Sequence, residues 1–385
     1  MKEKYYVVAK TITKWKLDNP FENWLGYKAD TSEFWKRIYV LYYKIFDRQY
    51  YNNGIRFINE EIAKQRFNLE NRIDGKPLTD EYLRRDMVYS LHRFGVNFFE
   101  YFVYKFYNKS CVGREKINNL RIQYGYCELL NAPHIRELFD NKSKTYEYLK
   151  PFYNRDLISI LSAEDFQNFV SFVNRHKSFI LKPLRGVHGI GIKIYKSFNE
   201  DVSSFFKEWL HNGPFVAEEL IEQAPEMSVL HKESINTIRI STFRVGNEVT
   251  IYGAAIRMGT GNAFVDNAGS GGIFCHINPL YGFVDSNAKD YLGNEYVVHP
   301  DTDIRFVGFD IPNWNGLIEL VKKVALVIDG ATIISWDFAF SNKGWVLLEA
   351  NDVGGPDLIQ DYEDGNKCIL HSLIDKYFEY KTNNK

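Results

Sequence analysis

The N-terminal third of the chain has apolar residues spaced three and four apart, which is the pattern of amphipathic helices. Aromatic and aliphatic side chains recur at these intervals in residues 32–46, and Ser32 is a suitable helix cap. Residues 59–69 show a weaker version of the pattern, and Thr79 begins a longer periodic run that reaches Leu91. We therefore predict a mainly helical region over residues 1–135.

Residues 95–107 within this region are aromatic on nearly every side. Such a run fits either a helix on a membrane surface or a buried helix that holds the region to the rest of the protein. A peripheral membrane helix normally has a Lys-rich polar face, and this run lacks one. The pattern favours the buried helix.

Beyond about residue 135, short apolar runs with strand character alternate with helical patterns. Residues 177–183, 192–195 and 214–221 are predicted strands, and residues 198–210 and 314–329 are predicted helices. Residues 237–257 have the pattern of a hairpin that turns at Gly246 and Asn247, and residues 334–351 that of a second hairpin turning at 341–344. This mixture of hairpins and helices indicates an α+β layer architecture.

Composition adds limits to this picture. The 385 residues are 45% hydrophobic and 25% charged, and this length predicts two or three structural units. A net charge of -1 gives no electrostatic reason to expect nucleic acid as a partner. The four cysteines are far apart and form no CxxC pair, and no run of roughly 20 apolar residues or signal-peptide pattern is visible. We expect a soluble cytoplasmic protein with reduced thiols and no transmembrane segment.

The hairpin over residues 334–351 is the first candidate site. Residues two apart on a strand point to the same face, so Glu349 and Asn351 share a face of one strand while Asp337 lies on the other. Three oxygen ligands from rigid strands suit one or two Mg²⁺ ions. A hairpin with a few surface carboxylates explains these residues equally well when the hairpin is considered alone.

A glycine-rich segment forms the second candidate site. A strand delivers Lys182, and Gly186, Gly189 and Gly191 follow in a loop that turns back towards another strand. Glycines allow backbone N–H groups to surround phosphate oxygens, and the lysine adds a point charge. His188 is a candidate for a phosphate contact or a base, and a simple loop histidine is the alternative. The segment is neither a Walker A sequence nor a dinucleotide fingerprint, and a plain glycine-rich hairpin tip is an equal alternative.

Further polar residues follow in sequence. The strand at 214–221 ends in Glu218 and Glu219, which fits an adenine pocket or a pair of solvated acids. Arg239 and Arg257 lie on neighbouring predicted strands and are suited to bracket a phosphoryl group or an oxyanion, although single strand arginines are usually surface residues. The loop that begins at Asp266 is polar and glycine-rich, as expected of a segment that closes over a substrate.

The order of these motifs resembles that of an ATP-grasp domain from about residue 136 to the end. The resemblance is closer to the sugar-transfer-associated ATP-grasp proteins found with surface-polysaccharide synthesis systems. It rests on four segments as well as the motifs above: residues 85–95, 101–107 and 234–239, and Asp266-Asn267 with Gly271-Gly272. Each short motif is weak, but their ordered combination is specific and covers most of the chain.

The resemblance implies a first ATP-grasp lobe over 136–220 and a second over 221–385, and it leaves open whether the mainly helical region over residues 1–135 contacts the acceptor substrate. It implies ATP contacts from the first lysine segment, the lid and the hinge: Lys142, Lys182, Gly186, His188, Gly189, Gly191, Glu218, Glu219, Leu220, Ile221 and Glu226. It implies magnesium ligands at Asp337, Glu349 and Asn351, and catalytic roles for Lys182, Arg239 and Arg257. It implies substrate contacts from the remaining polar and glycine positions: Asn236, Asp266, Asn267, Gly271, Gly272, Gly354 and Gly355.

Two details of the resemblance remain open. Glu226 has the spacing of the ribose-binding acid of D-alanine–D-alanine ligases, but Glu222 competes for that role. Those ligases also carry an arginine two residues before the first magnesium carboxylate, where this chain has Ser335. Arg239 or Arg257 must supply that charge, or the chemistry differs.

The resemblance implies an ATP- and Mg²⁺-dependent carboxylate–amine ligase, with Mn²⁺ as an alternative metal. The association with sugar transfer suggests small-molecule substrates, an amino acid or amine and a sugar acid or amino sugar of a capsule, O-antigen or exopolysaccharide precursor. A kinase that phosphorylates a sugar-related hydroxyl and a nucleotide-binding protein without ligase activity are the alternatives. Neither substrate nor the oligomeric state follows from the sequence, and a homo-oligomer stays open.

Overall fold

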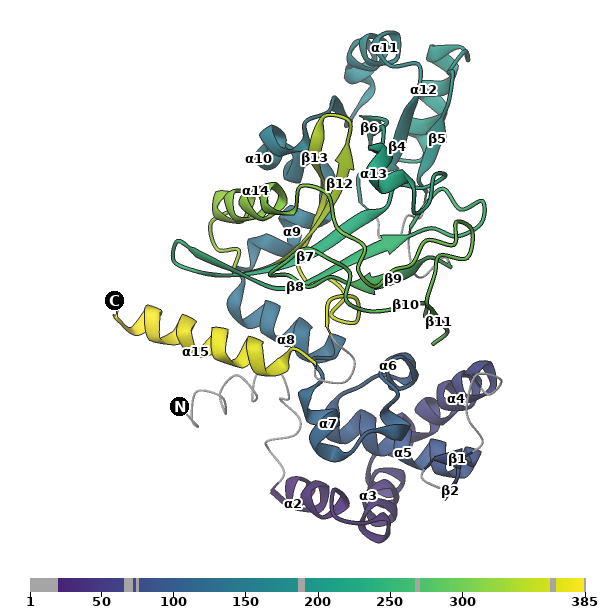
Figure 1. Cartoon of the computed structure of the whole chain (residues 1–385), viewed down its shortest axis with the longest axis vertical. Coiled ribbons are helices and arrows are strands. Elements are labelled where there is room, and N and C mark those ends of the chain that lie inside the picture. Colours follow the sequence, from purple (N-terminus) through teal and green to yellow (C-terminus); the bar gives the residue numbers. More distant parts are fainter. Residues whose placement is uncertain are drawn as a thin grey trace. The chain divides into compact units, whose positions relative to one another are not determined.

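The computed structural model describes residues 20–65, 72–73, 76–185, 191–266, 271–291, 293–360 and 365–383. These residues form two compact units, whose elements are labelled in Figure 1. The helical unit holds the described residues up to Leu130, those of Lys289–Glu295 and those from Gly355 onward. The sheet unit holds Asn131–Ala288 and Tyr296–Gly354. The last described helix therefore belongs to the same unit as the N-terminal helices.

The helical unit contains the helices that the apolar periodicity predicts. Its helices are α2 (Pro20–Ala29), α3 (Glu33–Phe46), α4 (Arg48–Gln65), α5 (Asp80–Phe94), α6 (Phe98–Val103), α7 (Cys111–Lys116), α8 (Leu120–Leu130) and α15 (Lys367–Asn383), with the short strands β1 (Arg72–Ile73) and β2 (Lys76–Pro77) between α4 and α5. Ser32 caps α3 by accepting a hydrogen bond from the Trp35 backbone N–H, and Thr79 caps α5 in the same way. Tyr101 and Phe102 of α6 are buried, as the aromatic run predicts. No described helix in either unit is long and apolar enough to cross a membrane.

The sheet unit begins with two helices and a four-stranded sheet. Its first elements are α9 (His134–Asp140), α10 (Lys142–Tyr153), β3 (Leu157–Ile160), α11 (Phe166–Arg175), β4 (Phe179–Pro183), β5 (Lys193–Tyr195), α12 (Val202–His211) and β6 (Phe215–Glu219). The strands run in the order β3-β6-β4-β5, and every pairing is antiparallel. Phenylalanines from α11, α12 and the strands fill one core. Many of the aromatic residues in the sequence therefore fill the hydrophobic core.

A seven-stranded sheet forms the rest of this unit. Its elements are α13 (Pro225–Ser228), β7 (Thr237–Val245), β8 (Glu248–Met258), β9 (Ile273–His276), β10 (Ala288–Lys289), β11 (Glu295–Tyr296), α14 (Trp314–Val327), β12 (Ile333–Ser341) and β13 (Gly344–Asn351). The order is β11-β10-β9-β8-β7-β12-β13, and β10 and β11 each contain one residue, Lys289 and Glu295, that belongs to the helical unit. One face is apolar and packs against α10 and α14, with Ile238, Trp336 and Leu347 fully buried. The α+β class predicted from the sequence is confirmed, with a helical region before the sheets.

Both predicted hairpins are present in this sheet. Val245 pairs with Glu248 around the Gly246–Asn247 turn, and Ser341 pairs with Gly344 around the second turn. Gly344 has φ +94°, a conformation that side chains with a Cβ rarely adopt. The Ser341 hydroxyl accepts from the Lys343 N–H and donates to the Gly344 carbonyl. The turn sets the register as far as the pair of Phe338 and Leu347, and a register shift between Asp337 and Phe338 then places Asp337 opposite Glu349.

Candidate functional site

The second face of the seven-stranded sheet carries a row of charged side chains, one on each of four adjacent strands. Arg239 of β7 pairs directly with Asp337 of β12, and Asp337 pairs with Glu349 of β13. Thr237, two residues before Arg239, pairs with Arg257 of β8. Directly opposed residues of an antiparallel pair point to the same face, so these charged side chains line up across the sheet. We refer to Arg257, Arg239, Asp337 and Glu349 as the polar row.

Asp337 is the electrostatic centre of the polar row. Its carboxylate is buried and accepts two hydrogen bonds from Arg239, one from Nε to Oδ1 and one from Nη2 to Oδ2 at 2.8 Å. Arg257 Nη2 donates to Oδ2 at 3.3 Å. Burial alone raises the pKa of Asp337, but the charges of Arg239 and Arg257 outweigh it and hold the pKa below its ordinary value. Asp337 is thus a permanent anion between two arginines.

The second arginine also organises the start of the loop at residue 266. Arg257 donates to the Thr237 hydroxyl at 2.8 and 3.0 Å and lies 3.4 Å from the Asp266 carboxylate. The Thr237 hydroxyl in turn donates to Asp266. Asp266, the last described residue before residue 271, is therefore held by Thr237 and Arg257.

Ser335 occupies the position where D-alanine–D-alanine ligases carry an arginine. Its hydroxyl lies 2.5 Å from that of Ser241 on β7. Gly354 (φ +55°) passes directly over Ser335, and a Cβ on Gly354 would lie 2.0 Å from the serine oxygen. An arginine at 335 has no room beside this backbone, so the cationic charge near Asp337 comes from Arg239 and Arg257.

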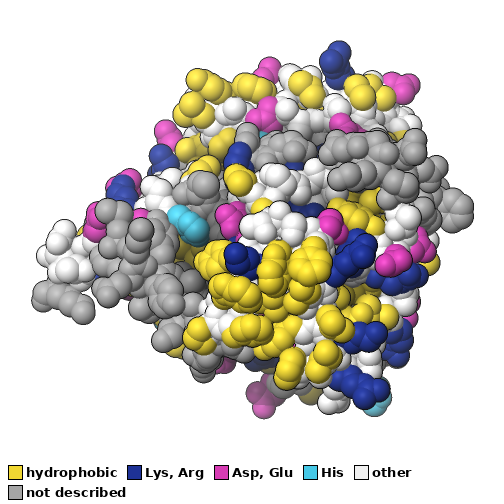
Figure 2. Space-filling model, turned by 90° about the horizontal axis from the view of Figure 1, so that it is seen from below, with side chains coloured by type: hydrophobic (Ala, Val, Ile, Leu, Met, Phe, Trp, Pro, Cys, Tyr) yellow, Lys and Arg dark blue, Asp and Glu magenta, His cyan; other side chains and the backbone are white. Residues whose placement is uncertain are grey.

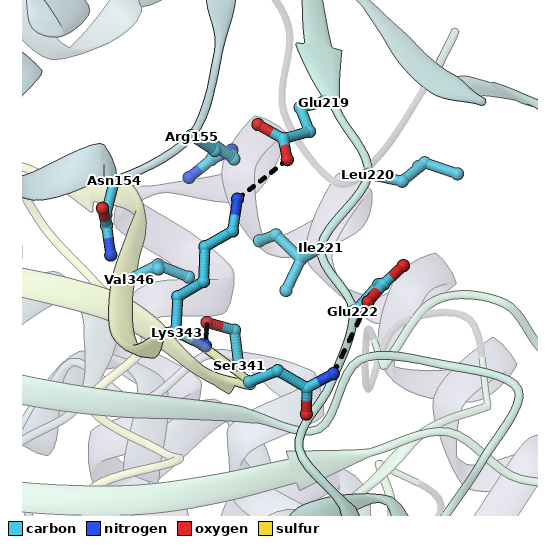
Figure 3. A pocket seen from close by; sticks show the side chains of 10 residues that line it. Asn154, Arg155, Glu219, Leu220, Ile221, Glu222, Ser341, Lys343 and Val346 are labelled. Atoms are coloured by element: carbon cyan, nitrogen blue, oxygen red, sulfur yellow. Dashed lines mark hydrogen bonds and ion pairs between the residues drawn. The ribbon is translucent and has the colours of Figure 1, made fainter. Parts of the chain in front are cut away.

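A pocket of about 270 Å³ lies in the sheet unit between the end of β6 and the turn of the β12–β13 hairpin (Figure 3). It is lined by Asn154, Arg155, Glu219, Leu220, Ile221, Glu222, Ser341, Asn342, Lys343 and Val346. The Lys343 side chain extends from the turn and pairs with Glu219 at 3.1 Å. Backbone hydrogen bonds from Asn342 N to Glu222 O and from Ala224 N to Phe340 O join the segment after β6 to the hairpin. The pocket therefore has one wall from each of the two sheets.

Glu218, next to this pocket, is the centre of a buried group of charges. Its Oε2 accepts from Lys182 Nζ at 2.9 Å and from Arg155 Nη2 at 2.6 Å. Arg155 also donates to the Leu347 carbonyl of β13. Burial opposes ionisation of Glu218, but Lys182 and Arg155 reverse that effect and lower its pKa to about 2. The lysine predicted to contact phosphate is thus held in place by a carboxylate of the pocket strand.

This lowered pKa predicts a specific dependence of stability on pH. Glu218 has a lower pKa in the folded state than the 4.5 of an unfolded chain. Its stabilisation is therefore complete above pH 4.5 and is lost as the pH falls towards 2. Between pH 6 and pH 3 we expect wild type to lose about 2 kcal/mol of unfolding free energy through this group, and Glu218→Gln to lack that loss. Urea unfolding at both pH values measures the difference.

Glu226→Gln is the matched control for this measurement, because Glu226 is exposed and has no ion pair among the described residues. It should keep the wild-type dependence on pH. An unchanged dependence in Glu218→Gln would show that the carboxylate is not ion-paired in solution.

The remaining predicted ATP contacts lie at different distances from the pocket. Lys142 is the first residue of α10, and its Nζ is 3.9 Å from Glu349, so it lies beside the polar row. Gly191 is described, with φ +77° and close to Pro183, whereas Gly186, His188 and Gly189 lie outside the described residues. Glu226 lies in α13 and is not a lining residue of the pocket, whereas Glu222 is.

The predicted substrate contacts are more scattered. The Asn236 amide nitrogen donates to the Met227 and His231 carbonyls, while its oxygen is buried without a hydrogen-bond partner. The Gly271 carbonyl accepts from Thr260, and Gly272 directly precedes β9. Asn267 lies outside the described residues. Gly354 belongs to the sheet unit and Gly355 to the helical unit.

The sequence predictions did not include Arg155, Lys343 and Thr237. Arg155 follows α10 in a stretch without a recognisable motif, so nothing in the sequence indicated its contact with Glu218. Lys343 sits in a hairpin turn, where a lysine is ordinarily a solvated residue. Thr237 was visible, because it lies two residues before Arg239 on a strand whose alternation was already apparent. Its pairing with Arg257 was not predictable, because it depends on a register shift between Ser241 and Thr242 that the alternation does not reveal.

The donor set at the β12–β13 hairpin suits Mg²⁺. Asp337, Glu349 and Asn351 offer two carboxylates and an amide oxygen from one face. Asp337 already accepts three N–H contacts from the two arginines, and a side-chain hydrogen bond from Asn351 also lowers its pKa, so this carboxylate is largely occupied. The Glu349 side chain is 45% exposed and is the most accessible of the three. The residues fit a metal bound mainly through Glu349, with Asp337 and Asn351 beside it.

Comparison with solved structures gives matches to synthetases and a ligase at low identity. N5-carboxyaminoimidazole synthetase from Staphylococcus aureus, complexed with ADP, is 13% identical with a TM-score of 0.39, over 63% of this chain and 53% of that one. D-alanyl-alanine synthetase A from Vibrio cholerae is 10% identical with a TM-score of 0.42, over 67% and 72%. D-alanine–D-alanine ligase from Bacillus anthracis is 14% identical with a TM-score of 0.40, over 69% and 77%. The chain thus spans about half the length of the first of these structures.

Comparison at the level of sequence identifies the family. No curated protein matches the chain significantly. The family described as sugar-transfer associated ATP-grasp matches residues 121–361, which is more than half of the chain and includes the polar row, the pocket and Glu218. The chain belongs to the sugar-transfer-associated ATP-grasp family.

Proposed function

We propose that this protein is an ATP- and Mg²⁺-dependent carboxylate–amine ligase that forms an amide and releases ADP and phosphate. The observation that supports this proposal is the polar row, in which two arginines and two carboxylates face the same side of one sheet. Phosphoryl transfer needs cations around the transferred group and carboxylates to hold Mg²⁺. The polar row offers both within four strands.

The proposed reaction has two steps. A carboxylate oxygen of the first substrate attacks the γ-phosphorus of ATP, and the bond to the β-phosphate oxygen breaks, which yields an acyl phosphate and ADP. The amine of the second substrate then attacks the acyl carbon, loses a proton and displaces phosphate. Phosphorylation is needed because a free carboxylate has no adequate leaving group for an amine.

The residues of the sheet unit divide these tasks. We assign the nucleotide base and ribose to the pocket between β6 and the hairpin turn, with Glu219 and Glu222 near the ribose hydroxyls. The pocket-lining position of Glu222 supports it over Glu226 for this contact. Lys182 and Lys142 would contact phosphates, and Arg239 and Arg257 would stabilise the acyl phosphate and the oxyanion that forms when the amine adds. Losing one such donor typically lowers a rate by about 100- to 1000-fold.

Glu349, Asp337 and Asn351 would hold the Mg²⁺ ion. When bound, the metal supplies positive charge that is needed as the phosphoryl group is transferred. The two arginines keep Asp337 ionised and oriented for this role.

The name of the family supports sugar-linked substrates for this reaction. We propose that the carboxylate or the amine belongs to a sugar acid, an amino sugar or an amino acid used in a surface-polysaccharide precursor. Release of ADP, screened against matrices of sugar acids and amines and followed by mass spectrometry, tests the proposal. An amide product with equimolar phosphate is the expected result. A stable phosphorylated product would replace the ligase with a kinase, and no turnover with any pair would favour a nucleotide-binding protein.

Lys182→Ala tests the nucleotide assignment without knowledge of the substrates. The change should weaken ATP binding by about 10- to 100-fold, because one charge-assisted hydrogen bond to phosphate is lost. The fold should survive, since Arg155 still pairs with Glu218. Calorimetry with ATP and Mg²⁺ measures the change. Lys193→Ala on β5 removes an exposed lysine of the same sheet and should bind ATP like wild type, while unchanged affinity in Lys182→Ala would contradict the phosphate contact.

A further inference from the structure

Helices α2 and α3 of the helical unit present a broad apolar face to solvent. Figure 2 shows hydrophobic side chains gathered on the side of the molecule seen from below, with lysines and arginines along one edge. The exposed fractions of Phe34, Ile45 and Phe46 are 65%, 60% and 74%. Phe21, Trp24, Tyr27 and Leu41 are also exposed on these two helices. A contiguous exposed apolar area of this kind ordinarily marks a binding surface.

The aromatic rings on this face are in mutual contact. Neighbouring ring centroids lie 4.9 to 5.8 Å apart along a series that runs through Phe34, Trp35, Trp24, Phe21, Tyr42 and Phe46. Rings at these separations pack against each other, so they form a continuous surface and do not project singly. We refer to this surface of α2 and α3 as the aromatic face.

Helix α3 has two distinct sides. Tyr39 and Tyr43 are buried on one of them. Phe34, Leu41 and Ile45 recur at helical spacing on the outer side, and exposed Arg37 and Lys44 lie among them. The outer side is therefore apolar and basic, without a carboxylate in this series.

The acidic side chains near this face are directed elsewhere. Glu33 pairs with Lys36 and Arg85, and Asp30 pairs with Arg93. Glu22 accepts a hydrogen bond from the buried Tyr43 hydroxyl. Asp47, the C-cap of α3 next to Phe46, is exposed. Arg37 and Lys44 are exposed without an ion pair among the described residues and outnumber it, so the outward charge of α3 is net positive.

We propose that the aromatic face docks on the surface of a bilayer that contains anionic lipids. Tryptophan, tyrosine and phenylalanine rings insert at the boundary between headgroups and acyl chains, and lysines and arginines next to them pair with lipid phosphates. A second copy of the chain fits less well, because a two-fold symmetric contact centred between Arg37 and Lys44 of α3 would bring Arg37 of each copy close to Lys44 of the other. This proposal concerns the helical unit alone and does not depend on the ligase activity.

Sedimentation of the full chain with vesicles tests the proposal. Vesicles of phosphatidylcholine with added phosphatidylglycerol should bind the protein. Vesicles of phosphatidylcholine alone should bind it more weakly, by at least about fivefold for each Lys or Arg side chain that contacts an anionic lipid. Phe34→Gln combined with Ile45→Gln should weaken binding at least about tenfold through lost apolar contact. Arg37→Glu combined with Lys44→Glu should abolish the preference for the anionic lipid, and added salt should reproduce that effect. These side chains are exposed, so the thermal unfolding of the variants should match wild type.

Two control variants share these chemical changes at other exposed positions. Val112→Gln with Leu280→Gln removes apolar side chains outside the aromatic face, and Lys322→Glu with Lys323→Glu reverses charges on α14. Both controls should bind vesicles like wild type. The proposal is overturned by absence of binding to anionic vesicles, or by equal binding of the aromatic-face variants and their controls. It is also overturned if the aromatic-face variants abolish a dimer seen by analytical ultracentrifugation while vesicles bind no protein.

Discussion

Asp337→Asn should lower the free energy of unfolding by about 3 to 5 kcal/mol, the largest loss of stability expected from a single conservative change in the sheet unit. The substitution keeps the size of the side chain but removes the only charge that both Arg239 and Arg257 approach in the polar row. Both guanidinium groups would then face a neutral amide in a largely buried position, and Arg257 would keep its contact with the Asp266 carboxylate at 3.4 Å. Urea unfolding at neutral pH measures the loss.

Asp329→Asn is the appropriate comparison for this variant. Asp329 is fully exposed and lies 3.8 Å from Arg244, so its removal should change stability by less than about 0.5 kcal/mol. The double variant Asp337→Asn with Arg239→Met should recover part of the loss, because the buried cation that makes two hydrogen bonds to Asp337 is removed as well. A loss below about 1 kcal/mol in Asp337→Asn would show that the carboxylate is not the buried partner of both arginines.

Local patterns were sufficient to predict most of the elements from the sequence. The cap at Ser32, the hairpin turns at 246–247 and at 341–344, and the helix before the second hairpin all depend on neighbouring residues, and all are present. The grouping of α15 with the N-terminal helices depends on contacts between distant segments. A single sequence carries no local signal for such contacts, so a division at about residue 135 was the only one that the patterns offered.

The side-chain contacts of the candidate site were also only partly predictable, because they join residues that are distant in the sequence. Asp337, Glu349 and the two arginines were recognisable as charged residues on apolar strands. The sequence did not reveal that β12 lies between β7 and β13, and this order is what places Arg239 opposite Asp337. The absent arginine at 335 is explained by the same order, since Arg239 and Arg257 reach the carboxylate from β7 and β8. Arg155 was invisible because its partner Glu218 is 63 residues away and the loop that carries it has no motif.

The ion pair between Lys343 and Glu219 joins two lining residues of the pocket that we assign to the nucleotide. A ribose hydroxyl and the Lys343 ammonium would compete for the same carboxylate, so nucleotide entry requires Lys343 to rotate or to bind the nucleotide itself. The lysine side chain is largely exposed and the pair is worth at most about 1 kcal/mol, so the cost to the nucleotide is small. The pair therefore orients Glu219 before binding without obstructing it.

Glu349→Gln should lower Mg²⁺-dependent ATP consumption by at least about 100-fold while leaving stability within about 0.5 kcal/mol of wild type. Glu349 is half exposed, and its nearest cation, Lys142, is 3.9 Å away, so the fold does not depend on it. Its carboxylate is also the one in the polar row that no arginine contacts among the described residues, which leaves it available to a metal.

Calorimetry with ADP gives a readout that needs no acceptor substrate. Mg²⁺ should tighten ADP binding to wild type and have at least about tenfold less effect on ADP binding to Glu349→Gln. Glu319→Gln, an exposed change on α14 on the opposite side of the sheet, should retain the full effect of Mg²⁺. Equal Mg²⁺ dependence in Glu349→Gln and wild type would remove Glu349 from the metal site and leave Asp337 as a purely structural partner of the arginines.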